Sequence, residues 1–147
     1  SCAALDDRFW PGAAAEDQQL RMIGVVIVAH GGLAGEFRAA LEHVVGPQEH
    51  LEPFSIGPDD DVETRRVELI ETVRREPAVQ GVVVLTAMFG GPPSNLAISV
   101  MEPGRIDVVA GINLPMLIKL ASVREEKSLD EAVTCAQDAG RQYITVA

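Results

Sequence analysis

Aromatic residues and cysteines are scarce in this sequence of 147 residues. Aromatic side chains account for 4% of the chain, whereas apolar residues account for 47%. The interior must therefore be built mainly from Val, Ile, Leu and Ala, a composition that suits an α/β fold. The two cysteines, Cys2 and Cys135, show neither CxxC nor zinc-ligand spacing. We therefore expect two plain thiols, no disulfide framework and no metal site.

Basic residues are also few, because 12 Lys and Arg stand against 22 Asp and Glu, for a formal net charge of −10. Such a charge repels nucleic-acid phosphates and anionic lipid headgroups, so we expect no nucleic-acid partner. No apolar run approaches the roughly 18 residues that a membrane-spanning helix needs, and the first residues lack a signal-peptide pattern. We therefore expect a cytoplasmic protein that is not embedded in a membrane.

The chain divides into an N-terminal extension and one domain. Residues 1–21 are rich in Ala and acidic residues and show no hydrophobic period. We interpret them as disordered or as an addition to the domain. The first continuous apolar run begins directly afterwards, so we place the single domain at residues 22–147.

Within the domain, continuous β-branched runs alternate with segments of helical periodicity. The runs IGVVIVA and GVVVLT are apolar throughout, as is typical of parallel strands buried on both faces. This alternation predicts an open, doubly wound α/β sheet of four parallel strands with helices on both faces. We expect strands at residues 23–29, 51–56, 80–86 and 106–110, helices at residues 33–45, 59–75, 93–101, 114–122 and 128–142, and a β-rich tail at residues 143–146.

Two glycine-rich loops directly follow buried strands. The first is AHGG, at residues 29–32, and the second is AMFGGPPSN, at residues 87–95. Ligands of open α/β sheets bind at the carboxyl ends of the strands. Because the two strands are expected to be neighbours, the two loops should meet at that end.

His30 is the histidine best placed for chemistry. Two glycines follow it and expose its ring, and the N-terminus of the next helix favours an anion beside it. A neutral imidazole is a competent nucleophile near pH 7. The alternative is a histidine that only packs or caps at a strand end. His43, in the last turn of a helix, and His50, in a loop, have much weaker support for a chemical role.

Gly90 and Gly91 form the centre of the second loop. Glycine permits a positive φ and close backbone approach, and Pro93 suits the first turn of a helix, so this loop can cradle an anion. The alternative is a tight βα turn that needs glycine only for its geometry. Neither the P-loop pattern GxxxxGK[ST] nor the dinucleotide pattern GxGxxG occurs, which argues against a nucleotide.

Three segments in register, IGVVIVAHGGLAGEF, VVVLTAMFGGPPSNLA and DVVAGINLPML, resemble the mannose-type enzyme IIA family of the bacterial phosphotransferase system (PTS). The resemblance implies a phosphotransferase component of sugar transport in which His30 becomes a phosphohistidine. It implies that the backbone of Gly31, Gly90 and Gly91 binds the phosphate, with no cofactor. It also implies HPr as the donor, an enzyme IIB-like acceptor, association with a permease complex, and a homodimer in which residues 143–146 cross to the partner's sheet as an antiparallel strand.

Two positions depart from the pattern of this family. Relatives usually carry an aspartate three residues before the glycine pair, where it orients the active histidine through Nδ1–H, but this chain has Ala87. They commonly place Ser or Thr directly after the pair, where this chain has Pro92, which lacks both donors. By the same resemblance, the candidate site-lining residues are Thr86, Ala87, Met88, Phe89, Pro92, Ser94 and Asn113.

These departures support an alternative function, a regulatory protein-interaction module of the same fold with weak or lost phosphotransfer. A third class, a protein that binds a small metabolite, would need a deep apolar pocket at the strand ends. Phosphorylation of His30 separates the first two functions, and the shape of the strand ends tests the third.

Overall fold

The computed structural model describes residues 22–75 and 80–147. The predicted N-terminal extension, residues 1–21, lies outside this described part. The strands are β1 (Gly24–His30), β2 (Leu51–Ile56), β3 (Val82–Thr86) and β4 (Ile106–Ala110). The helices are α2 (Leu33–Val45), α3 (Val62–Arg75), α4 (Pro92–Ser99), α5 (Leu114–Val123) and α6 (Leu129–Gln142).

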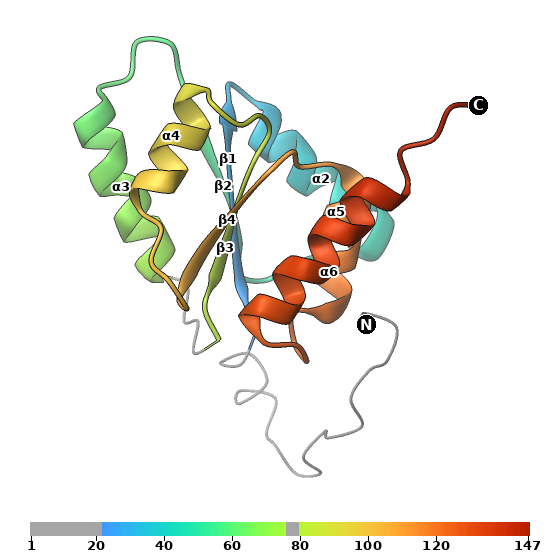
Figure 1. Cartoon of the computed structure of the whole chain (residues 1–147). Helices are drawn as coiled ribbons and strands as arrows, with labels where there is room; N and C mark the ends of the chain where they lie inside the picture. Colours follow the sequence, from blue (N-terminus) through green and yellow to red (C-terminus); the bar gives the residue numbers. More distant parts are fainter. Residues whose placement is uncertain (1–21, 76–79) are drawn as a thin grey trace.

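The strands form one parallel sheet in the order β2-β1-β3-β4. Helices α3 and α4 cover one face of this sheet, and α2, α5 and α6 cover the other (Figure 1). The predicted fold class, four parallel strands with helices on both faces, is confirmed. Because the strands are parallel, all four carboxyl ends lie at the same end of the sheet.

The residues of β1 alternate between two cores because side chains of a strand point to opposite faces. Val25, Ile27 and Ala29 join the core under α2, α5 and α6, whereas Val26 and Val28 join the core under α3 and α4. A strand that is buried on both faces has no polar alternation. This burial explains why its sequence is a continuous apolar run.

Two elements begin more than one residue later than the sequence pattern predicts. Helix α3 starts at Val62 rather than at residue 59, because Asp61 Oδ2 accepts the N–H of Thr64 at 3.1 Å and caps the helix from outside. Strand β3 starts at Val82, after Gly81 at φ +106°. A Cβ at Gly81 would meet the carbonyl oxygen of Arg105 at 2.8 Å, so the close approach of β4 requires glycine there.

The C-terminal tail forms no strand within the single chain. Residues 144–147 follow α6 without regular secondary structure, and Tyr143, Ile144 and Val146 have exposed fractions of 63%, 77% and 97%. The exchange of this tail between two chains stays a prediction.

The expectation of a plain thiol is wrong for Cys135, because its sulfur is disulfide-bonded. Cys135 lies on the buried side of α6. Cys2 lies outside the described residues. Across residues 22–75 and 80–147, no helix is long and apolar enough to span a bilayer.

Candidate active site

His30 is the last residue of β1 and is exposed, although the six residues before it are buried. Gly31 follows at φ +53°, a left-handed conformation that turns the chain away from the sheet and into α2. No described residue forms a hydrogen bond or an ion pair with the imidazole. The strand thus presents a solvent-accessible imidazole on a rigid support.

The loop between β3 and α4 lies beside His30, because β1 and β3 are paired with Val28 opposite Thr86. Figure 1 shows the β1–α2 and β3–α4 connections at the same end of the sheet. Thr86 continues the position of Val84, whose side chain faces α3 and α4. The two loops therefore follow neighbouring strands at the same end of the sheet.

The amides predicted to cradle phosphate are partly used inside the fold. The N–H of Gly31 donates to the carbonyl of Ile56 at 3.0 Å, and the N–H of Gly90 donates to Ser94 Oγ at 2.8 Å. Ser94 is fully buried, and its Oγ–H donates to the carbonyl of Gly91 at 3.0 Å. The hydroxyl of Ser94 therefore closes the loop from inside and is already used within it.

Pro92 and Pro93 occupy the first two positions of α4, after Gly91 at the N-cap. Neither proline has an N–H. The N–H of Ser94 is therefore the first backbone donor within this helix. The first turn of α2 is richer in donors, since it contains Leu33, Ala34 and Gly35 and no proline. The N-terminus of α2 therefore presents more free amides than that of α4.

Thr86 ends β3, and its hydroxyl is buried without a hydrogen-bond partner among the described residues. Its carbonyl accepts the N–H groups of Gly111 and Ile112 at 2.8 and 3.1 Å, which ties the end of β3 to the turn after β4. Ala87 is half-buried and packs against the core under α2, α5 and α6. The position where relatives carry an aspartate is therefore an apolar contact in this chain.

Exposed apolar side chains lie on the segments that follow β1 and β3. Met88 and Phe89 are 65% and 76% exposed at the tip of the β3–α4 loop, and Leu33 is exposed in the first turn of α2. Sequence reasoning placed the first two near the site but missed Leu33, although it directly follows the HGG motif. Exposed apolar groups gathered on one end of a domain favour contact with another protein.

Asn113 has a structural role at the N-cap of α5. Its Oδ1 accepts the N–H of Met116 at 3.0 Å, and its Nδ2–H donates to the carbonyl of Gly140 at 2.8 Å. The oxygen of the carboxamide thus caps α5, and its nitrogen joins α5 to the end of α6.

The other two histidines lie away from this site. His50 precedes β2, at the opposite end of the sheet from His30, and its carbonyl accepts the N–H of Val25 at 2.9 Å. His43 lies in the last turn of α2. Their positions leave His30 as the histidine at the carboxyl ends of the strands.

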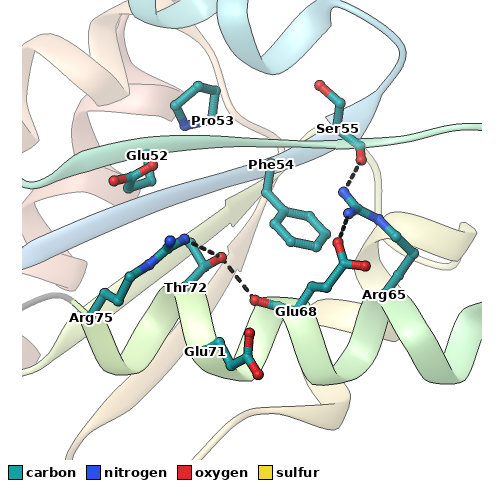
Figure 2. A pocket seen from close by; sticks show the side chains of 9 residues that line it. All are labelled: Glu52, Pro53, Phe54, Ser55, Arg65, Glu68, Glu71, Thr72 and Arg75. Atoms are coloured by element: carbon teal, nitrogen blue, oxygen red, sulfur yellow. Dashed lines mark hydrogen bonds and ion pairs between the residues drawn. The ribbon is translucent and has the colours of Figure 1, made fainter.

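Two cavities lie along α3 rather than at His30. A cavity of about 350 Å³ is lined by residues of α3 and β2 (Figure 2). Another of about 220 Å³ lies between α3 and the segment that follows α4. The first is lined mainly by charged and polar side chains, and neither is lined by His30. The metabolite-binding alternative therefore gains no support from them.

Two carboxyl groups have shifted pKa values. Asp61, exposed near the end of β2, has its pKa lowered chiefly by the hydroxyl hydrogen bond from Thr64 and further by the backbone N–H of Thr64. Burial raises the pKa of Asp107 in β4, and the nearby charge of Asp130 raises it further. No three described His, Cys, Asp or Glu side chains gather as a metal site would need.

Comparison with known proteins places this geometry in one family. Residues 24–137 match the family described as "PTS system fructose IIA component". The chain is 30% identical over 124 residues to the "PTS system mannose-specific EIIAB component" of Escherichia coli K12, covering 83% of this chain and 38% of that relative. It is 27% identical over 126 residues to the "PTS system fructose-specific EIIA component" of Bacillus subtilis 168, covering 85% of this chain and 86% of the relative.

Solved structures agree with this assignment. The phosphotransferase system component EIIA from Streptococcus agalactiae superposes with a TM-score of 0.75 at 29% identity, over 85% of this chain and 97% of that chain. The mannose/sorbose-specific IIA subunit from Enterococcus faecalis also gives 0.75, at 27% identity, over 86% and 95% of the two chains. The chain spans well under half the length of the EIIAB relative, so it corresponds to one part of that protein. From the match over residues 24–137 and these relatives, we conclude that the chain belongs to the mannose/fructose-type IIA family of the PTS.

Proposed function

We propose that this chain is a cytoplasmic phosphohistidine carrier in which His30 accepts a phosphoryl group from phospho-HPr and passes it to an enzyme IIB-like protein. The observation that carries the proposal is the exposed His30 at the carboxyl end of a buried central strand, within a domain of the IIA family. The printed names of the relatives, which include mannose- and fructose-specific components, support a role in sugar transport. Association with a permease complex is part of the same proposal.

In the proposed transfer, the lone pair of His30 Nε2 attacks phosphorus in line. The N–P bond to His30 forms as the bond between phosphorus and the donor's histidine nitrogen breaks, and that electron pair stays on the donor nitrogen. The proton on Nδ1 of His30 remains in place. In a second transfer of the same kind, a nucleophile of the acceptor attacks phosphorus, and the electron pair of the broken N–P bond returns to Nε2 of His30. Such a transfer depends mainly on positioning and on stabilisation of the phosphoryl oxygens.

The backbone around His30 is suited to the phosphoryl oxygens. Helix α2 begins at Leu33, three residues after His30, so its positive N-terminal end lies close to His30 along the chain. Amides from Gly32 onward are the main candidate donors, with Gly91 and Ser94 contributing from the second loop. The apolar rim of Leu33, Met88 and Phe89 would contact the protein partners.

Incubation with enzyme I, HPr and phosphoenolpyruvate tests the proposal. We expect one phosphoryl group per chain, labile in acid and stable in base, because a phosphoramidate hydrolyses readily once protonated. His30→Ala should abolish the label, whereas His43→Ala and His50→Ala, as matched controls, should retain it. Label that persists in His30→Ala contradicts the site. No label on the wild-type chain, with a folded domain, would favour the regulatory module that Ala87 and Pro92 suggest.

We also propose that two copies form a homodimer in which the C-terminal tail of each copy pairs with β4 of the other. The tail carries exposed apolar side chains at Tyr143, Ile144 and Val146, and β4 is an edge strand. An added strand would satisfy edge N–H and C=O groups and bury the apolar tail. Deletion of residues 143–147 should reduce the dimer to a monomer in sedimentation velocity, and an unchanged dimer would contradict this role of the tail.

A further inference from the structure

The outer edge of β2 differs from an ordinary sheet edge. The strand order leaves β2 and β4 at the two edges of the sheet. An edge strand normally presents a row of unpaired N–H and C=O groups, to which another strand can add. Copies of a sheet that is open at both edges can add to one another in an unlimited row. Copies that are open at one edge can form only a pair.

The hydrogen bonds to β1 define which groups of β2 point outward. The N–H of Val25 donates to the carbonyl of His50 at 2.9 Å, and the N–H of Gly31 donates to the carbonyl of Ile56 at 3.0 Å. The N–H and C=O groups of successive residues point alternately to the two sides of a strand. The backbone groups of the even-numbered residues of β2 therefore point to β1. The backbone groups of Leu51, Pro53 and Ser55 therefore point away from β1 and form the outer edge of the sheet.

Two features interrupt this outer edge. Pro53, at its centre, has no N–H and cannot donate to an added strand. The carbonyl of Ser55 already accepts a hydrogen bond from Nη2 of Arg65 on α3 (Figure 2). An incoming strand would lack a donor at the middle position and would have to displace a guanidinium at the next.

Arg65 is held firmly in this position. Its guanidinium lies over the ring of Phe54, 4.0 Å from the centroid, and it pairs with Glu68 on the same helix. Its Nε lies 3.5 Å from Asp60 Oδ2, and its side chain is only 22% exposed. Figure 2 shows the guanidinium between Glu68 and Ser55. A planar group fixed on three sides loses little freedom when it binds the carbonyl, and it is costly to displace.

The outer edge of β4 lacks such protection toward its carboxyl end. The N–H of Val82 donates to the carbonyl of Arg105 at 2.8 Å, so the backbone groups of odd-numbered residues point to β3. The N–H and C=O groups of the even-numbered residues of β4 therefore point outward. Ile106 exchanges two hydrogen bonds with Glu102, at 2.8 and 3.1 Å. No described residue bonds to the outward groups of Val108 and Ala110. These two residues remain available to an added strand.

We propose that Pro53 and Arg65 close the β2 edge to strand addition, so that a second copy of this chain adds its C-terminal strand only at β4 and assembly stops at two. The dimer part of this inference rests on the proposed function, whereas the closure of β2 does not. Two copies that each use one edge form a closed pair, while copies that use both edges form an open chain.

The double variant Pro53→Thr/Arg65→Met tests the closure. Thr restores an N–H with good strand propensity, and Met keeps the length of the side chain without its donors. Sedimentation velocity over a concentration series should show the wild-type chain limited to one small species, and the double variant forming species larger than a dimer. Arg75→Met is the matched control, because Arg75 on the same helix donates to Thr72 Oγ1 at 3.0 Å and not to a strand.

Hydrogen exchange shows where the new association occurs. In the double variant, protection of the peptide that covers residues 51–56 should rise with concentration, while circular dichroism confirms the fold. The two single variants should show weaker association, and either can replace the double variant if that variant does not fold. Folded variants that sediment like the wild-type chain, or larger species without new protection of β2, would overturn the proposal. A monomeric wild-type chain with self-associating variants would overturn the dimer and support the closure.

Discussion

The carboxamide of Asn113 donates to the carbonyl of Gly140 at 2.8 Å, across 27 residues of sequence. The same side chain caps α5 through the N–H of Met116. A Cβ at Gly140 would approach Met116 Cε to 2.9 Å, so glycine allows α6 to lie this close to α5. The pair joins the start of one helix to the end of the other on the α2 side of the sheet.

Asn113→Ala should lower the free energy of unfolding by about 1–3 kcal/mol, because it removes both the N-cap and the interhelical hydrogen bond. Asn113→Ser is the matched comparison, since serine keeps a capping oxygen but is too short to donate to Gly140. We expect its cost to be intermediate in urea unfolding. Equal stability of the alanine variant and the wild-type chain would contradict the structural role of Asn113.

Thr86→Val should raise the free energy of unfolding by about 1 kcal/mol, because valine has the shape of threonine without the buried, unpartnered hydroxyl. Thr86→Ser keeps the hydroxyl and loses a methyl group, so it should be destabilising. Thermal unfolding of the three proteins checks both directions. A destabilised valine variant would mean that the hydroxyl has a partner in solution.

Asp107→Asn should stabilise the protein at neutral pH. The folded-state pKa of Asp107 is raised by burial and by the charge of Asp130, so the folded protein favours the protonated carboxyl. The contribution of this group to stability is therefore present below its unfolded pKa and is lost as the pH rises through the folded value. The advantage of the variant should be largest near pH 7 and should vanish in acid, below the ordinary pKa of aspartate.

Urea unfolding of the Asp107→Asn and wild-type proteins over a pH series measures this difference. Asp59→Asn serves as a control, because Asp59 is exposed near the end of β2. An Asp107→Asn variant that is less stable at pH 7, or whose advantage grows in acid, would show that the carboxylate makes a favourable contact in the folded state.

Ala87→Asp should accelerate phosphoryl transfer to His30. A carboxylate near Nδ1–H would hold the ring in the tautomer whose Nε2 attacks, and it would offset the charge that develops on the imidazole. Charge-assisted hydrogen bonds contribute about 1.5–3 kcal/mol, which corresponds to a gain of roughly 10- to 150-fold if the whole effect appears in the transition state. Pro92→Thr in the same chain should add to the gain by restoring two donors.

Rapid-quench measurement of phosphoryl arrival from phospho-HPr measures these rates. Ala87→Asn is the matched control, because it has a similar shape without the charge. Ala87 contacts the apolar core under α2, so circular dichroism should confirm that each variant is folded. If neither aspartate variant is faster than the wild-type chain, the native site orients His30 in another way or has lost phosphotransfer.

The sequence predicted the strands and the histidine at the end of β1 because both are local properties. A continuous run such as IGVVIVA is typical of a strand buried on both faces, and the two glycines that follow His30 favour exposure of its side chain. The neighbouring position of the two glycine loops followed from the βαβ pattern, since parallel strands place their carboxyl ends together. The start of α3 was less accurate, because Asp61 caps this helix from outside and only its side-chain hydrogen bonds reveal it.

The tertiary structure alone decided which polar groups are free. The amides of Gly31 and Gly90 look available in sequence, but Ile56 and Ser94, from other segments, already bind them. Arg124 resembles a surface cation, yet it is 1% exposed and its guanidinium donates to the carbonyls of Glu49 and His50. Arg65 reaches Ser55 only because α3 lies against β2. Local patterns therefore determined the strands and the position of His30, whereas hydrogen-bond partners depend on distances between remote segments, which only the folded chain determines.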